Sequence, residues 1–184
     1  MRGVLIFLGL LISIDALADA KAGEKKARLC ITCHKIGDAM AFAPLLDAQP
    51  SKYLVQAITD YKTGKRPDPT NLMKTNAASL SARDIRDLAD YFASRPPVLG
   101  AYATDPAKVA AGGKRVAELK CGSCHGSAIS GSESVPRLEG QLTRYLIRQL
   151  EAFAEGRRTH PPTETPFNRL GDVEEIAHYF TAAK

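Results

Sequence analysis

The 184-residue chain has no tryptophan and only three methionines, four cysteines and four histidines. It also lacks an apolar run that could span a bilayer, because segment 4–14 holds about 11 residues where a spanning helix needs about 20. Segment 4–14 follows a basic Arg2 and precedes Ala18-Asp19-Ala20, which fits a small-residue cleavage site. We therefore predict that residues 1–20 are a secretory signal peptide rather than a membrane anchor, which places the mature chain in the periplasm.

No stretch rich in lysine and arginine with interleaved aromatic residues is present, which argues against a nucleic-acid-binding protein. Residues 21–96 contain 13 basic and 8 acidic side chains, whereas residues 97–184 contain 11 and 10. This mild excess of positive charge in the first half favours docking with acidic protein partners. Loose association with a membrane is left open.

The four cysteines fall in two short motifs, CITCH at 30–34 and CGSCH at 121–125. Four cysteines in an exported chain would ordinarily suggest two disulfides, but C-x-x-C-H is the pattern of covalent haem attachment. On a helical turn, positions i, i+3 and i+4 share one face, so two thiols can reach the haem vinyl groups and the imidazole can reach the iron. The predicted attachment residues are Cys30, Cys33, Cys121 and Cys124, and the predicted proximal iron ligands are His34 and His125.

Two other uses of such cysteine pairs fit less well. A four-cysteine zinc site has its pairs some 15–20 residues apart, but 87 residues separate Cys33 from Cys121. A thioredoxin-like redox pair needs a βαβ context, and the chain shows no strand pattern. Two covalent haem c groups are therefore the predicted cofactors.

The chain also repeats itself outside the motifs. The segment PLLDAQPSKYLVQAITDYKTGKR (44–66) aligns without a gap to PRLEGQLTRYLIRQLEAFAEGRR (136–158), at an offset of 92 residues. Further on, DIRDLADYF (84–92) aligns with DVEEIAHYF (172–180) at an offset of 88, so the second copy has lost four residues between Arg158 and Asp172. We predict two domains, 21–96 and 97–184, with a proline-containing linker at about 94–105.

Each copy is predicted to fold as three helices, so the expected fold class is all-α. The middle helix should begin near Ser51 or Thr143 and end at Gly64 or Gly156. Asp105-Pro106 should start the first helix of the second copy, and Ser81-x-x-Asp84 and Asp172-x-x-Glu175 resemble capping boxes. The apolar stripe of the last helix is Ile85, Leu88, Ala89 and Phe92 in the first copy and Val173, Ile176, Ala177 and Phe180 in the second.

These paired motifs and repeated blocks resemble the di-haem class I cytochromes c, most of all the cytochrome c4 family, and are similar to the di-haem subunit of flavocytochrome c sulfide dehydrogenases. The resemblance implies two tandem cytochrome c domains related by a pseudo-twofold axis, each wrapped around one haem c. It also implies single-electron transfer in the periplasm between redox proteins, with a terminal oxidase or a periplasmic dehydrogenase as partner.

The resemblance also implies roles for further residues. Pro44 and Pro136 match the proline whose carbonyl accepts a hydrogen bond from the proximal histidine. Met73, in a polar stretch expected to be a loop, matches the distal ligand of haem 1, with core packing as the alternative. Met40 is interpreted as a packing residue or as a contact at the haem edge.

The second copy departs from this pattern, because Thr165 stands where the methionine is expected and no methionine follows Met73. His160 lies 35 residues after His125, whereas Met73 lies 39 after its proximal histidine, a difference equal to the deletion. His160 is therefore a candidate distal ligand, stiffened by Pro161 and the next proline, and its nitrogen should lie about 4 Å from that of His125. The alternative is an exposed His160 and an open haem 2.

The leading functional prediction is an electron carrier that is not an enzyme, with haem 1 (His/Met) at higher potential than haem 2 (bis-His or open). The alternative is a di-haem enzyme or enzyme subunit, for peroxide reduction or sulfur-compound oxidation, in which Glu164 and Arg158 are the available loop charges. His178 is expected to have a surface or interdomain role.

Overall fold

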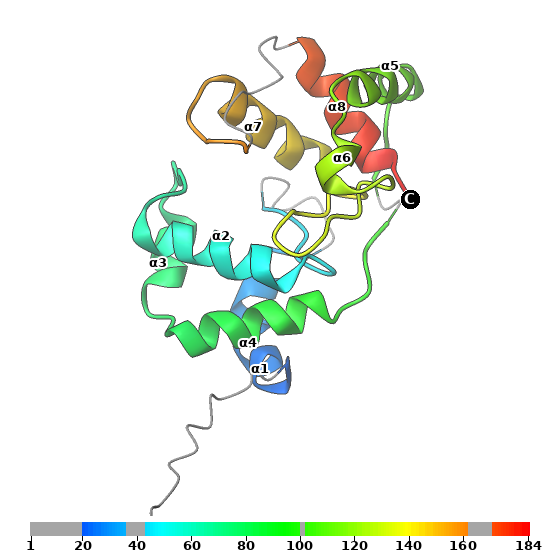
Figure 1. Ribbon diagram of the computed structural model, residues 1–184. Coiled ribbons are helices and arrows are strands. Elements are labelled where there is room, and N and C mark those ends of the chain that lie inside the picture. Colours follow the sequence, from blue (N-terminus) through cyan, green and yellow to red (C-terminus); the bar gives the residue numbers. More distant parts are fainter. Residues whose placement is uncertain (1–19, 36–42, 100–101, 162–170) are drawn as a thin grey trace, which may run out of the picture.

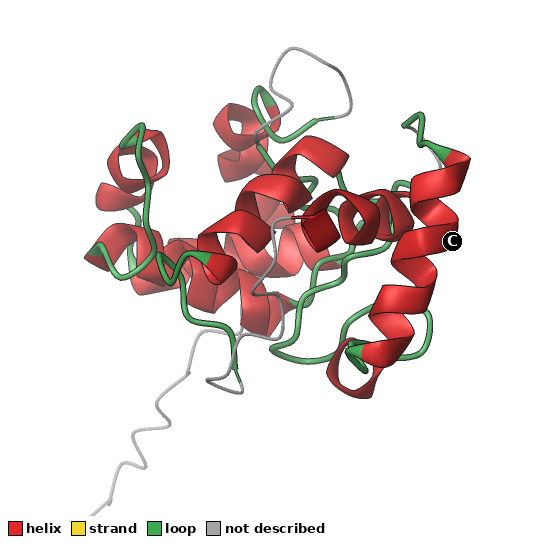
Figure 2. Ribbon diagram, turned by 90° about the horizontal axis from the view of Figure 1, so that it is seen from above, coloured by secondary structure: helices red, strands yellow, loops and turns green. Residues whose placement is uncertain are grey.

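The computed structural model describes residues 20–35, 43–99, 102–161 and 171–184. In these ranges the chain forms helices joined by turns and loops, with one isolated bridge between Ser132 and Val135 (Figure 1, Figure 2). The helices are α1 (Ala20–Ile31), α2 (Ser51–Thr63), α3 (Leu72–Ala78), α4 (Ala82–Ala93), α5 (Pro106–Glu118), α6 (Gly122–His125), α7 (Thr143–Ala154) and α8 (Gly171–Ala182). The all-α prediction is confirmed.

The helices form two groups, each with its own apolar core. Unit one, α1–α4, occupies the lower half of Figure 1, and unit two, α5–α8, occupies the upper half. The four apolar positions predicted for α4 are all buried, as are the four predicted for α8. Within the described residues, no helix is both long enough and apolar enough to cross a membrane. The predicted signal peptide, apart from Ala20, lies outside the described residues.

The first helix of each unit crosses the last at a glycine. A Cβ atom on Gly23 would lie 2.0 Å from the carbonyl oxygen of Asp87 in α4, and one on Gly112 would lie 2.0 Å from that of Glu175 in α8. Any side chain larger than the hydrogen of glycine at these two positions would push the helices apart. The two units therefore use the same close helix crossing.

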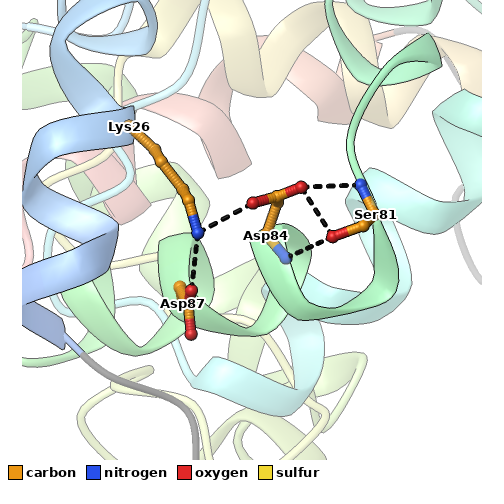
Figure 3. A network of polar contacts seen from close by, with 4 residues as sticks. All are labelled: Lys26, Ser81, Asp84 and Asp87. Atoms are coloured by element: carbon orange, nitrogen blue, oxygen red, sulfur yellow. Dashed lines mark hydrogen bonds and ion pairs between the residues drawn. The ribbon is translucent and has the colours of Figure 1, made fainter.

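A polar network fixes the crossing in unit one (Figure 3). Lys26 Nζ in α1 lies 2.6 Å from the carboxylate of Asp87 and 2.7 Å from that of Asp84, both in α4. The Asp87 side chain is completely buried, so Lys26 neutralises a charge that would otherwise be costly to bury. Asp84 also accepts from the Ser81 backbone and hydroxyl, and its own N–H donates to Ser81, so the predicted capping box is confirmed.

Two local predictions are corrected by the structure. Helix α8 begins at Gly171, so Asp172 lies inside the first turn and is not a cap. Its carboxylate instead accepts from Arg115 Nε in α5 at 3.0 Å.

Met73 lies in α3 rather than in a loop. The helix follows a left-handed Asn71, and the Asp68 carboxylate accepts from the Lys74 backbone at 2.9 Å, which together start a helical turn in a polar sequence.

Two glutamines join the units reciprocally. Gln49 Nε2 donates to the carbonyl of Arg137, whose N–H donates to Gln49 Oε1, at 2.8 and 3.0 Å. Gln141 repeats both bonds with the backbone of Leu45, at 2.9 and 2.8 Å. Gln141 follows Gln49 by 92 residues, the same offset that relates Arg137 to Leu45. Equivalent residues thus make equivalent contacts, which is the mark of a twofold-related interface.

Candidate haem sites

Both C-x-x-C-H motifs adopt one helical turn. The His34 N–H donates to the Cys30 carbonyl at 3.0 Å, just after the end of α1. The His125 N–H donates to the Cys121 carbonyl at the same distance, and α6 carries that turn. The motif residues therefore have the one-face spacing that the sequence predicts for attachment of two thiols and a ligand.

The four thiols of these motifs are free cysteines, as thioether formation requires. Burial raises the pKa of the Cys30 thiol and of the Cys121 thiol above the ordinary value. Before haem is attached, both thiols therefore stay protonated and poorly reactive toward solvent at neutral pH. The second thiol of the second motif, Cys124, is exposed.

The histidine of each motif is held by the proline that the family resemblance indicates. The His34 Nδ1 lies 2.7 Å from the Pro44 carbonyl, and the His125 Nδ1 lies 2.9 Å from the Pro136 carbonyl. Because a carbonyl only accepts, Nδ1 carries the proton and Nε2 keeps its lone pair for a metal. Burial lowers the pKa of each ring, although the proline carbonyl partly opposes this, so the imidazoles are neutral.

His160 lies beside His125, the motif histidine of unit two. The ring centroids of His125 and His160 are 6.1 Å apart, and their planes are inclined by 34°. Phe153 in α7 meets the His160 ring edge-on, at 5.0 Å and 86°, and the Arg158 guanidinium lies 4.4 Å from the centre of the Phe153 ring. Burial, then the neighbouring His125 and Arg158, lower the pKa of His160, so its ring is neutral and able to donate a lone pair.

Met73 occupies the first turn of α3 and is half-buried. Its neighbour Leu72 is among the exposed large apolar side chains, at 47%. The structure thus places Met73 on a helix that packs against α2. Met40 and Glu164 lie outside the described residues, as does Thr165. His178 Nδ1 accepts from the Asp105 N–H, 3.1 Å away, at the start of α5.

A cluster of cations and phenols between the units was not singled out from the sequence. Arg66 Nη2 donates to the hydroxyl of Tyr145 at 2.8 Å and to Gln149 at 3.1 Å, and Nη1 reaches the hydroxyl of Tyr53 at 3.4 Å. Arg158 also donates to Gln149. The sequence repeat could have indicated this cluster, because Tyr53 aligns with Tyr145 and Arg66 aligns with Arg158.

This cluster is suited to an anion. Arg66 is buried, its Nε has no hydrogen-bond partner, and no carboxylate among the described residues pairs with it or with Arg158. Two neighbouring guanidinium groups with no counter-charge are costly to bury. The propionate carboxylates of a bound haem would supply the negative charge that these arginines lack, so the residues present fit the cofactor.

Known proteins with similar sequences and structures share this architecture. The cytochrome c family model matches residues 110–176. Cytochrome c4 of Pseudomonas aeruginosa is 36% identical over 170 residues, which cover 85% of this chain and 82% of that protein. The crystal structure of reduced cytochrome c4 from Pseudomonas stutzeri has a TM-score of 0.77 at 28% identity, covering 91% of this chain and all of that one. A thiosulfate dehydrogenase electron acceptor of Thiomonas intermedia is 30% identical over 181 residues, 92% of this chain and 79% of that protein.

Proposed function

Because this chain belongs to the cytochrome c4 family and carries two covalent haem c groups, we propose that its second haem iron is bound by His125 and His160. Haem 2 is attached through Cys121 and Cys124. The family relationship also makes the chain an electron carrier rather than an enzyme. In unit two a histidine then takes the place of the methionine that the chain lacks.

The ring separation carries this proposal. An imidazole nitrogen binds a metal at about 2 Å and lies about 1.1 Å from the ring centroid, so two imidazoles opposed across one iron have centroids about 6 Å apart. The distance between the His125 and His160 centroids is 6.1 Å. Rotation of a ring about its metal–nitrogen bond leaves this distance unchanged, so the 34° angle between the planes is compatible with ligation.

In unit one we propose haem attachment through Cys30 and Cys33, with His34 as proximal and Met73 as distal ligand. The bond from His34 Nδ1 to the Pro44 carbonyl supports the proximal assignment, since it leaves Nε2 for the iron. The position of Met73 in a half-buried turn supports the distal one. Bound haem supplies a one-electron Fe(III)/Fe(II) couple, and the protein sets its potential through the axial ligands.

The two ligand sets order the haems by potential. A thioether is a soft ligand that favours Fe(II), whereas a second neutral imidazole stabilises Fe(III). Haem 1 is therefore the higher-potential centre, and electrons move from unit two to unit one. We propose that Arg66 and Arg158 neutralise haem propionates between the units, which shields these negative charges from each other.

We further propose that the chain is exported, with residues 1–20 removed, and works in the periplasm as domains 21–96 and 97–184. The redox partners are a terminal oxidase or a periplasmic dehydrogenase. The similarity to a thiosulfate dehydrogenase electron acceptor supports a dehydrogenase as the electron donor.

Potentiometric titration of the holoprotein tests the ligation. The wild type should titrate in two steps, with haem 2 the lower. In His160→Met a thioether replaces the imidazole, so the lower potential should rise on the order of 0.1 V toward the upper one. His178→Met is the matched control and should leave both steps in place. A lower step that does not move in His160→Met would rule out His160 as the ligand.

A further inference from the structure

The outer face of α1 presents a cationic strip beside the haem-attachment motif of unit one. Lys25, Arg28, Leu29 and Thr32 follow i, i+3, i+4 and i+7 spacing, and all four are exposed. Leu29, directly before Cys30, exposes 65% of its surface and is the most exposed large apolar residue of the described chain. These four residues are called the α1 patch.

No acidic side chain in the described part of the chain forms an ion pair with the positive charges of the α1 patch. Lys26, on the side of α1 that faces α4, pairs with Asp84 and Asp87. No ion pair of the described residues involves Lys25 or Arg28. Glu24 is the only acidic residue of α1, so the helix keeps a clear excess of positive charge on its solvent side.

The equivalent face of unit two has a different character. The glycine at the helix crossing sets the register, so Lys25, Arg28 and Leu29 correspond to Lys114, Ala117 and Glu118 in α5. An exposed cation and an exposed leucine are thus replaced by alanine and glutamate.

The remaining cations of α5 are already paired. Arg115 binds Glu118 and Asp172, each at 3.0 Å, and Lys108 pairs with Glu174. Only Lys114, of the three basic residues in α5, is outside an ion pair. Lys120, directly before Cys121, is also exposed and outside the ion pairs of the described residues, but no exposed leucine accompanies it or Lys114. The combination of unpaired cations with an exposed leucine beside the motif is therefore found in unit one, although both units share a fold.

We infer that the α1 patch is the surface on which an acidic redox protein docks to accept an electron from haem 1. The inference rests on the proposed function, in which haem 1 has the higher potential and is attached next to Leu29. Complementary charge accelerates encounter, and an exposed apolar side chain at its centre provides a contact that excludes water. One electron leaves Fe(II) of haem 1, which becomes Fe(III), and the oxidised centre of the partner gains it; no bond forms and no proton moves.

Stopped-flow oxidation of the fully reduced holoprotein tests this inference, with oxidised plastocyanin, an acidic blue copper protein, as the acceptor. In Lys25→Glu/Arg28→Glu the second-order rate constant at low ionic strength should fall at least about tenfold. The control Lys114→Glu/Lys120→Glu changes the net charge equally in unit two and should stay within about twofold of wild type. Equal slowing of both variants, or no slowing of the first, would overturn the inference.

A second variant tests the apolar contact. Leu29→Ser keeps the charge, so its effect should persist at high ionic strength, where attraction between exposed charges is screened. The rate constant should fall about threefold there, and an unchanged value would remove Leu29 from the docking surface. Redox titration of each variant measures the order of the two haem potentials. A wrong ligation proposal would appear in these potentials, whereas a wrong docking surface would appear in the comparison of rate constants.

Discussion

At the residue scale, the protein holds three histidines neutral and directs them by different means. The Pro44 and Pro136 carbonyls orient the proximal rings, whereas aromatic packing against Phe153 orients His160. Neutral rings matter because a protonated imidazole has no lone pair for a metal. Under the proposed ligation, a single histidine in a shortened loop changes the ligand set of one of two otherwise similar sites.

Arg66 is expected to raise the potential of the nearby haems, because a buried cation favours the reduced, less positive iron. In Arg66→Gln the midpoint potentials should fall by tens of millivolts, from a charge interaction on the order of 1–2 kcal/mol at an effective dielectric near 20. Potentiometric titration measures the shift. Arg157→Gln is the control, since Arg157 is exposed and pairs only with Glu155; equal shifts in both variants would contradict a specific role for Arg66.

Much of this residue-level picture was accessible from the sequence. The motif spacing predicted the histidine turns, and counting residues across the deletion predicted that His160 would approach His125. The role of Arg66 was not accessible, because its partner Tyr145 lies 79 residues away in the sequence and in the other unit. Such contacts depend on how the units dock, which local spacing does not reveal.

At the scale of elements, each unit is stabilised where its first helix crosses its last. Glycine permits the approach in both, and a cation on the first helix then binds carboxylates on the last (Figure 3). The sequence predicted the helices and their apolar stripes, since these follow a local period. It mispredicted the start of α8, because Asp172 is used by Arg115 from a distant helix rather than by its own backbone.

Removing the cation of unit one should weaken this crossing. Lys26→Met removes the ion pair with Lys26 from the completely buried Asp87 carboxylate, which should lower the free energy of unfolding by about 2 kcal/mol. Chemical denaturation of the holoprotein measures the loss. Lys25→Met, one position away and outside any ion pair, should cost less than about 0.5 kcal/mol; a similar loss in both would show that the ion pair contributes little.

At the scale of the whole molecule, the reciprocal bonds of Gln49 and Gln141 keep the two units in one relative position. Both side chains are nearly inaccessible, at 4% and 2% exposure, and each satisfies two buried backbone groups of the other unit. A fixed interface keeps the distance between the haems constant, and electron transfer between them depends on that distance. The repeat predicted two similar units, but only the structure shows that the glutamines join them.

Gln141→Ala should loosen this interface. It leaves the buried N–H and carbonyl of Leu45 without the Gln141 side chain, at about 1–3 kcal/mol each, so the free energy of unfolding should fall by about 2–6 kcal/mol. Calorimetry should then resolve two transitions where the wild type shows one. Gln56→Ala is the control, because Gln56 bonds only to Asp60 on the same exposed helix face. A single unshifted transition in Gln141→Ala would argue against a stabilising role.

The central claim is that His160 binds the iron of haem 2, and the spin state of the oxidised holoprotein tests it most directly. Electron paramagnetic resonance of the wild type should show two low-spin ferric haems, since both irons have two strong axial ligands. In His160→Ala one of the two signals should be replaced by a high-spin signal, while His178→Ala should match the wild type. A high-spin haem already present in the wild type, or two low-spin haems retained in His160→Ala, would contradict ligation by His160.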